Sequence, residues 1–238
     1  MKKFSDKRYK KVSLKIVQSE NLAELVGIML GDGCLSRSCK KYNVYVCGHK
    51  FDDFEYHDKI IRKLFLNVFN KTINISKKKN ENTIYIRFRD KRVFNILHSL
   101  GIPIGKKYGF LHIPDWVKRN NCLFLSFVRG LADTDGDLSI KKRKTISPYP
   151  IVRIRSKSKE FLSEILTILR HNDFYGSINT SGGCSTLSIP GHQNFNKWLE
   201  SIGFNNPKHQ KKIEAKIRPH TPLTRISRMF LVTFYLNW

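Results

Sequence analysis

The sequence predicts an α+β protein made of two similar halves. An apolar segment occurs twice: LVGIMLGDGCLS begins at Leu25 and VRGLADTDGDLS begins at Val128, so Gly, Asp, Gly, Leu and Ser recur at an offset of 103. A second stretch, 97–101, is repeated at 199–203. Each half also shows helical and strand patterns in one order, helix, strands, helix, strand pair, helix, which is typical of repeats with α+β layering.

The first half opens with an apolar helical pattern. Asn21 followed by Glu24 resembles a capping box, and Gly33 has the place of a left-handed glycine at a helix end. The sequence therefore predicts a helix from Asn21 to Gly33. A Lys-, Arg- and Ser-rich stretch over 36–41 follows. The remaining predicted elements are a strand over 42–46, a helix over 53–69, a hairpin of 72–75 and 83–88, and a helix over 91–100.

The second half repeats this order. A helix from about Leu123 should end at Gly136. The later elements are a strand over 151–155, a helix over 159–172, a hairpin of 176–179 and 185–189, and a helix over 195–202. We expect five parts: a basic segment 1–20, a first repeat 21–112, a linker 113–121 with Pro114, a second repeat 122–212, and a segment 213–238.

The charge balance is the strongest compositional signal. Lys and Arg number 44 against 19 Asp and Glu, a formal net charge of +25 spread along the chain. Such a charge favours a polyanionic partner, in the first place nucleic acid. The longest apolar run, 229–236, is too short to span a bilayer, and the N-terminus lacks the apolar core of a signal peptide, so a membrane protein is not expected.

The cysteines favour a reduced, intracellular protein. There are five, an odd number, and no two form a CxxC pair. Cys34, Cys39, Cys47 and His49 lie close in sequence, but their spacing fits no common zinc finger.

Two aspartates in the repeated segment are candidates for chemistry. Gly27 and Gly31 would let the two helices approach closely, which brings Asp32 and Asp135 together at one end. Adjacent carboxylates repel, and a divalent cation removes that conflict. Acids with a metal on a basic chain suit phosphodiester hydrolysis. The alternative is two plain helix ends with solvated acids, but recurrence in register favours function. The neighbouring Asp133 and Asp137 have no counterparts in the first copy and are expected to be structural or peripheral.

With these residues the chain resembles the single-chain, double-motif LAGLIDADG homing endonucleases. The resemblance spans about 21–212 and depends on the two Asp-Gly helix ends and the helix-to-strand order. It implies a pseudo-twofold monomer whose motif helices pack at the centre, with two saddle-shaped antiparallel sheets in the DNA major groove. It also implies Mg²⁺-dependent (or Mn²⁺-dependent) staggered cleavage across the minor groove. The metal-binding acids correspond to Asp32 and Asp135, and Gly31 and Thr134 before them complete the expected metal site.

The resemblance also suggests lysines that assist catalysis. The family often has Gln-Lys or Asn-Lys near the end of the first strand pair, and His49-Lys50 and Ser156-Lys157 occupy those places here. Lys50 and Lys157 are therefore catalytic candidates. Weaker candidates after the last helix of each half are Lys106, Lys107, Lys208 and Lys211. The alternative for each lysine is a phosphate contact or a solvated charge.

Base recognition is expected from the strands, because a strand in a major groove exposes every second side chain. Arginine is the commonest reader of guanine. The predicted DNA-binding residues are Tyr42, Tyr45, Lys77, Lys79, Tyr85, Arg87 and Arg89 in the first half, and Arg153, Arg155, Asn179, Ser181 and Ser185 in the second.

The predicted function is a site-specific endonuclease that cleaves a long, asymmetric double-stranded DNA site as a monomer. Two alternatives stay open on the same scaffold: an RNA maturase that binds intron RNA, and a DNA-binding protein that does not cleave. The expected location is an intracellular compartment that contains DNA, either cytoplasm or an organelle matrix.

Overall fold

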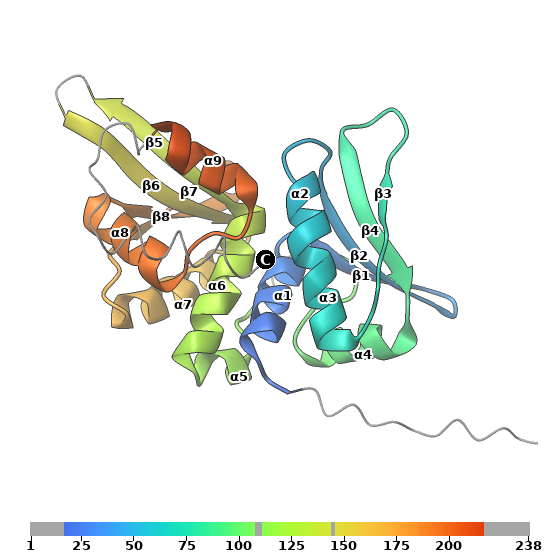
Figure 1. Ribbon diagram of the computed structural model, residues 1–238. Coiled ribbons are helices and arrows are strands. Elements are labelled where there is room, and N and C mark those ends of the chain that lie inside the picture. Colours follow the sequence, from blue (N-terminus) through green and yellow to red (C-terminus); the bar gives the residue numbers. More distant parts are fainter. Residues whose placement is uncertain (1–16, 108–110, 144–145, 217–238) are drawn as a thin grey trace, which may run out of the picture.

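Two four-stranded antiparallel sheets and their helices form two similar halves around a central helix pair (Figure 1). The computed structural model describes residues 17–107, 111–143 and 146–216. Most of the expected N-terminal segment and most of the segment 213–238 lie outside the described residues. The predicted α+β class with two repeated halves is confirmed, since both halves have the same strand order.

The central pair consists of α1 (Glu20–Leu30) and α6 (Asn121–Asp135). In α1 every residue from 22 to 30 is buried, which explains why its sequence is apolar all round. The helix is capped by Ser19, whose hydroxyl accepts a hydrogen bond from the Leu22 backbone N–H at 3.3 Å. The predicted capping box at Asn21 is therefore wrong, because the cap lies two residues earlier.

The first half forms one sheet in the order β1-β2-β4-β3. After α1, its elements are β1 (Gly33–Ser38), β2 (Lys41–His49), α2 (Phe54–Tyr56), a π-helical turn η1 (His57–Ile61), α3 (Arg62–Phe69), β3 (Ile75–Lys77), β4 (Thr83–Arg89) and α4 (Lys91–Ser99). The helices over 53–69 and 91–100 are confirmed. The Lys-, Arg- and Ser-rich stretch over 36–41, for which no element was predicted, ends β1 and forms the turn into β2. The strand expected at 72–75 begins only at 75.

The second half repeats the topology in the order β5-β6-β8-β7. Around α6 lie α5 (Asp115–Lys118), β5 (Gly136–Arg143), β6 (Ile146–Ser156), α7 (Lys159–His171), β7 (Ser177–Ser181), β8 (Cys184–Pro190), α8 (His192–Ser201) and α9 (Pro207–Lys216). The helices over 159–172 and 195–202 and the hairpin are confirmed. Strand β5 and helices α5 and α9 were not expected, and α5 lies within the expected linker.

Each sheet has one face against helices and one open face. Val44, Val46, Ile84 and Ile86 are buried on the helix-covered face of the first sheet. Because successive side chains of a strand point to opposite faces, the residues between them lie on the open face. The helix-covered face of the second sheet is formed by the buried residues Leu138, Val152, Ile154, Leu187 and Ile189. Among the described helices, none has the length and apolar character that a membrane crossing needs.

Candidate active site

The two central helices touch backbone to backbone, as their small residues predicted. A Cβ atom added to Gly27 would overlap the carbonyl oxygen of Phe127, and one added to Gly130 would overlap the carbonyl oxygen of Glu24. One turn further along, a Cβ atom on Gly31 would overlap the hydroxyl group of Thr134. These contacts are related by the offset of the sequence repeat, so the helices meet on a pseudo-twofold axis. They bring the ends of α1 and α6 together.

The glycines after the two acids have a different role from the one predicted. Gly33 is absent from the residues with positive φ, and Gly136 has φ −98° and ψ 163°, so neither is a left-handed cap. A Cβ atom at Gly136 would instead overlap the carbonyl oxygen of Ala132, and one at Gly33 would collide with Met29. Glycine is required here because the strand turns back directly over the last helical turn.

Asp32 and Asp135 therefore lie side by side at the carboxyl ends of the helices, half-buried. Burial raises the pKa of Asp32 from 3.8 to about 7, and the negative charges of Asp135 and Asp53 add to the rise. Burial likewise raises the pKa of Asp135 to about 6, against the lowering effect of Lys107 and Lys208. The prediction that these two acids meet is supported by their electrostatic interaction.

Lys107 lies at the centre of this arrangement. Its ammonium group donates hydrogen bonds to the carbonyl oxygens of Leu30, at 2.9 Å, and of Gly31. Burial lowers the pKa of Lys107, while the charges of Asp135 and Asp32 raise it. The lysine thus balances the charge of both acids and of the helix end. It was among the weaker candidates in the sequence.

A cavity of about 120 Å³ adjoins Asp135, while Asp32 is not among its lining residues. Lys157 lines it together with Asp135, Gly31 and Lys107, so this predicted catalytic lysine lies at the site. Lys50 is not among its lining residues. The Lys50 ammonium group instead lies over the ring of Phe51, 5.5 Å from the ring centroid.

The predicted metal ligands Gly31 and Thr134 have other partners. The Gly31 carbonyl oxygen accepts from Lys107, and the Thr134 hydroxyl group donates to the carbonyl oxygens of Gly130 and Leu131, at 3.0 Å each. In the parts of the chain that the structure describes, no three His, Cys, Asp or Glu residues gather as a metal-binding group. Cys34, Cys39, Cys47 and His49, which lie close in sequence, do not form such a group there.

A third carboxylate near the acids was not predicted. Asp53 is 8% exposed and accepts from the His49 backbone N–H at 2.9 Å, the Asn206 amide at 3.0 Å and the Lys208 ammonium group at 3.1 Å. Burial raises its pKa, but these hydrogen bonds outweigh burial and lower it. Asp53 therefore stays ionised beside Asp32.

Asn206 links the two halves behind the site. Its fully buried side-chain amide donates to Asp53 and, at 3.0 Å, to the carbonyl oxygen of Asp133 in the last turn of α6. Asp133 is also fully buried, and its carboxylate accepts from the Asn205 backbone N–H at 2.9 Å. The structural role expected for Asp133 is thus supported. Nothing local in the sequence marks Asn206, because its partners are distant in the chain.

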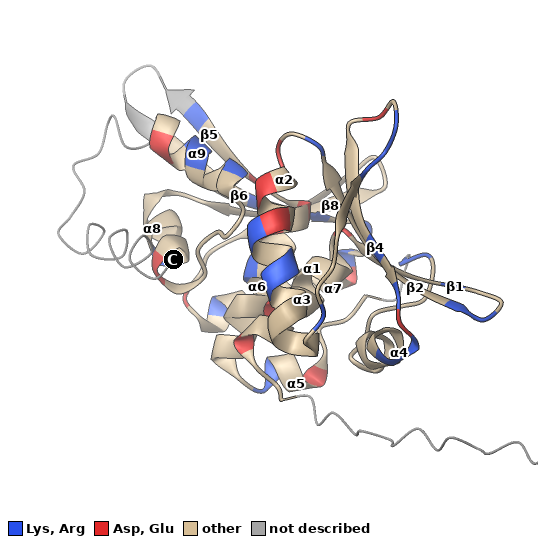
Figure 2. Ribbon diagram, turned by 45° about the vertical axis from the view of Figure 1, so that its right-hand side comes forward, with Lys and Arg blue, Asp and Glu red and all other residues tan. Residues whose placement is uncertain are grey.

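Lysines of α9 reach acids of both halves. Lys208 pairs with Asp53, the Lys211 ammonium group lies 3.4 Å from Glu55, and the Lys212 ammonium group lies 2.7 Å from Asp137. Figure 2 shows blue bands on α9 next to the red bands of α2, with Lys and Arg spread over both halves. The lysines of helix α9 therefore contact acids of the first half and of strand β5.

The open face of the first sheet carries four of the predicted DNA-binding residues. Tyr45 is the register partner of Arg87, whose guanidinium lies 5.2 Å from the Tyr45 ring centroid. Tyr85 and Arg89 share this face. Tyr42 and Lys77 do not lie on this face. The Tyr42 ring packs against Phe94, and the Lys77 ammonium group lies over the Phe54 ring, both on the helix-covered side. Their expected position was wrong, because both residues lie at the alternate strand positions whose side chains face the helices. Lys79 lies exposed in the turn between β3 and β4.

The second sheet carries four further predicted residues on its open face: Arg153, Arg155, Asn179 and Ser181. The prediction for Ser185 was wrong. It is 2% exposed and forms a 2.8 Å hydrogen bond with Thr180 on the opposite face. Asp137 is the register partner of Arg153, so it adds a negative charge to the open face.

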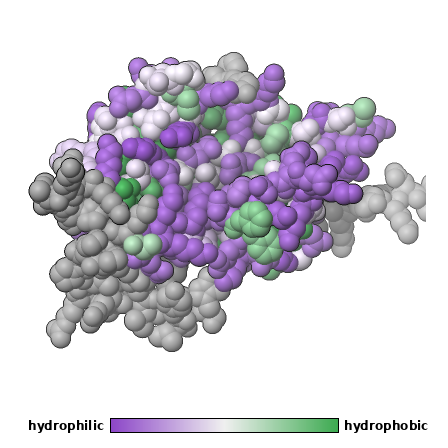
Figure 3. All heavy atoms as spheres, turned by 90° about the horizontal axis from the view of Figure 1, so that it is seen from above, coloured by the Kyte–Doolittle hydropathy of each residue, from purple (hydrophilic) through white to green (hydrophobic). Residues whose placement is uncertain are grey.

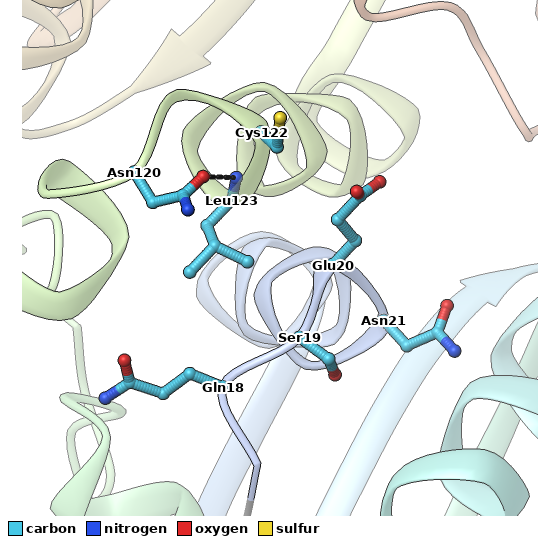
Figure 4. A pocket seen from close by; sticks show the side chains of 7 residues that line it. All are labelled: Gln18, Ser19, Glu20, Asn21, Asn120, Cys122 and Leu123. Carbon is cyan, nitrogen blue, oxygen red and sulfur yellow. Dashed lines mark hydrogen bonds between the residues drawn. The ribbon is translucent and has the colours of Figure 1, made fainter.

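A larger pocket, about 550 Å³, lies at the other end of the central helices. Figure 4 shows it between the amino ends of α1 and α6, where Asn120 caps α6 by accepting from the Leu123 backbone N–H. Its lining includes Ser19, Glu20 and Cys122. The acids lie at the opposite helix ends, so this pocket is separate from the candidate site.

Comparisons with known sequences agree with the repeated motif. Residues 124–236 match the LAGLIDADG-like domain family. Two curated proteins of Methanocaldococcus jannaschii are similar: the tRNA-splicing ligase RtcB, 31% identical over 142 residues, and the replication factor C small subunit, 26% identical over 200 residues. The matches cover 54% and 76% of this chain but only 14% and 11% of those proteins. The reactions of the whole relatives are therefore not transferred.

Comparisons with solved structures cover both halves. The homing endonuclease I-DmoI, in complex with DNA and Mn, matches 79% of this chain and 98% of its own at 18% identity and a TM-score of 0.56. Full-length DUF199/WhiA from Thermatoga maritima matches 92% of this chain and 66% of its own at 17% identity and a TM-score of 0.55. These matches confirm the predicted resemblance: the chain has the double-motif LAGLIDADG fold.

Proposed function

We propose that this protein is a site-specific, metal-dependent DNA endonuclease of the homing type, which makes a staggered double-strand break. The observation that carries the proposal is the pair of half-buried carboxylates, Asp32 and Asp135, held together where two helices end. Lys107 interacts with both acids, and Lys157 lines the same cavity as Asp135, on a chain of formal net charge +25. I-DmoI, which shares the fold, has been solved with DNA and Mn and with DNA and Ca.

The residues present fit Mg²⁺ or Mn²⁺. Mg²⁺ is commonly bound by one or two carboxylates plus substrate phosphates and waters, rather than by a cage of protein ligands. Asp32 and Asp135 would supply the carboxylates, and the Gly31 carbonyl oxygen would add a donor if Lys107 moved aside. Without a metal, burial of both carboxyls, and for Asp32 also the nearby charge of Asp135, makes them hold protons at higher pH.

A divalent cation at this place supplies an activated water and offsets negative charge on the attacked phosphate. The chain's own residues would hold the cation and add positive charge around the attacked phosphate. Asp32 and Asp135 each contribute from a different half, so one chain carries the acids for two strands. Lys107 and Lys157 add positive charge around the same cavity, where an attacked phosphate gains charge.

The open faces of the two sheets would hold the DNA. By strand register, Arg87 and Arg89 of the first half correspond to Ser188 and Pro190 of the second, which are different residue types. Two unlike faces in one chain favour a long, asymmetric site bound by a monomer. Such an enzyme would act in an intracellular compartment that contains DNA.

DNA binding without cleavage is the second candidate. Lys107 favours it, because its ammonium group already neutralises the acids and occupies the Gly31 carbonyl oxygen. A maturase that binds intron RNA is a further alternative on this scaffold.

The test uses a DNA fragment that spans the insertion site of the gene with the intervening sequence removed. We expect one staggered double-strand break with Mg²⁺ and none with EDTA. Binding without a break would support the second candidate. Accelerated splicing of the intron RNA without DNA cleavage would support the maturase. Failure to bind either nucleic acid would contradict all three.

A further inference from the structure

Phe51 is unusually exposed for a large apolar side chain. Most phenylalanines of the described residues are buried, yet Phe51 is 70% exposed and its neighbour Phe54 is 40% exposed. Seen from above, the molecule carries a compact hydrophobic patch ringed by hydrophilic residues near the centre of this face (Figure 3). Exposed apolar surface that polar residues surround is a feature of interaction sites.

Positive groups surround both rings. The Lys50 ammonium group lies 5.5 Å from the Phe51 ring centroid, and that of Lys77 lies 5.4 Å from the Phe54 centroid. The His49 ring meets Phe51 edge on, with the centroids 5.9 Å apart. Aromatic rings beside lysines are the combination that binds nucleic acids, since the ring stacks on a base and the cations meet phosphates.

The loop that carries Phe51 is fixed at both ends. The His49 backbone N–H donates to the Asp53 carboxylate at 2.9 Å, and the Asp53 N–H donates to the His49 carbonyl oxygen at 3.0 Å. The Lys50 N–H donates to the Asn82 carbonyl oxygen at 2.8 Å. Because the loop is already ordered, presenting the ring to a ligand costs little conformational entropy.

The loop also starts next to the acid pair. Strand β2 passes Asp32, whose carbonyl oxygen accepts from the Cys47 N–H at 3.2 Å, and the loop begins after His49. Behind it, Asp53 is bound by Asn206 and Lys208. A duplex with a phosphate at the acids would therefore have nearby bases within reach of this loop.

The second half has no counterpart of this ring. Its link from strand to helix is shorter: β6 ends at Ser156 and α7 begins at Lys159, with Lys157 and Ser158 between them. Neither is aromatic. Any contact made by Phe51 is thus made on one side of the site only.

We propose that Phe51 is a stacking wedge for DNA, which inserts against a base step beside the cleavage position on the side of the first half. Apolar wedges of this kind unstack base steps and kink the duplex, while the flanking lysines hold the backbone. The proposal rests on the proposed DNA binding, and it assigns a distortion of the target to one residue.

The test uses a duplex selected from a random library by the wild-type protein in EDTA, with 2-aminopurine placed in turn at each central position. Wild type should change the emission of the probe at one off-centre position. Phe51→Ala should abolish that change and weaken binding about 5- to 150-fold, since stacking on an aromatic residue is worth about 1–3 kcal/mol per base. Phe51→Trp should restore both.

Two controls separate the stacking of Phe51 from the charge of its neighbour and from the loss of any exposed aromatic side chain. Tyr175→Ala removes an aromatic side chain that is also 70% exposed and should leave binding unchanged. Lys50→Gln should reduce the slope of log K against log salt by about one, whereas Phe51→Ala should not alter that slope. Wild-type affinity and emission in Phe51→Ala would overturn the wedge alone. Failure of the wild type to bind any duplex would overturn DNA binding as well.

Discussion

At the scale of single residues, the site holds two acids at positions that disfavour negative charge, with lysines that partly compensate. Asp32 and Asp135 stand at the negative ends of two helix dipoles, where an acid is unfavourable by about 0.3–1 kcal/mol each. Lys107 and Lys208 offset part of that cost. The two acids were predictable because the motif repeats. Asp53 and Asn206 were not, because their contact joins residues 153 positions apart and leaves no local pattern.

This balance predicts how stability depends on pH in the absence of metal. With a pKa raised to about 7, Asp32 keeps its proton in the folded state where the unfolded chain has lost it. The folded state then binds more protons, so the free energy of unfolding falls as pH rises from about 4 to 7. Asp32→Asn should reduce this fall, and the remainder should come from other buried carboxyls with raised pKa values, such as Asp135 at about 6. Urea unfolding in EDTA at pH 5 and pH 8 measures it.

Asp137→Asn is the matched control for that experiment. Lys212 counteracts burial and lowers the pKa of Asp137, so its contribution has the opposite sign and is lost as pH falls. Adding Mg²⁺ at pH 8 should stabilise the wild type more than Asp32→Asn. Equal pH profiles for the wild type and Asp32→Asn would show that the Asp32 carboxyl is not perturbed.

At the scale of elements, the helices were easier to predict than the strands. Helix α7 shows clear amphipathic spacing. The turn between β7 and β8 was predictable from the pair Gly182 and Gly183, which adopt positive φ in the structure, 57° and 72°. Strands β1 and β5 were missed since each begins directly at the glycine that was taken for a helix stop. Of β1, only Gly33 and Leu35 are buried, too few for a recognisable alternation.

The helix contact predicts a large cost for added volume. Gly27→Ala would place a methyl group against the backbone of α6, which cannot move aside like a flexible side chain. We expect a loss of about 3 kcal/mol or more in the free energy of unfolding. Gly105→Ala is the control: its Cβ atom meets open space, and only the positive φ of 80° costs about 1–2 kcal/mol. Denaturant unfolding compares them, and equal losses would contradict the close helix contact.

At the scale of the whole molecule, one chain carries two similar folds with unlike surfaces. The sequence repeat predicted the pseudo-symmetry, and the period of two placed most, though not all, of the open-face residues. Helix α9 was not predicted, since its positions depend on acids in the other half and on few apolar contacts of its own. It adds two lysine pairs that join the halves, Lys208–Asp53 and Lys211–Glu55, and a third, Lys212–Asp137, within the second half.

The net charge predicts strongly salt-dependent DNA binding. If about ten phosphates are contacted, log K should fall with log salt at a slope of about −9. A gel-shift titration between low and physiological salt measures the slope. Near-independence of salt would contradict a phosphate-binding surface.

The unlike open faces predict an asymmetric target. Replacing one half-site by an inverted copy of the other should weaken cleavage, because each mismatched base pair costs about 1–3 kcal/mol. The mass of the protein–DNA complex should correspond to one chain. Equal cleavage of both palindromes and the natural site, or a complex with two chains, would contradict a pseudo-symmetric monomer.

The central claim is that Asp32 and Asp135 together form a metal-dependent cleavage site. Its most direct measurement is Mg²⁺-dependent cleavage and DNA binding by Asp32→Asn and Asp135→Asn beside the wild type, with Asp137→Asn as an acid outside the pair. We expect both pair variants to lose double-strand cleavage while they bind DNA with near wild-type affinity, and Asp137→Asn to cleave. Full cleavage by either pair variant would contradict the claim.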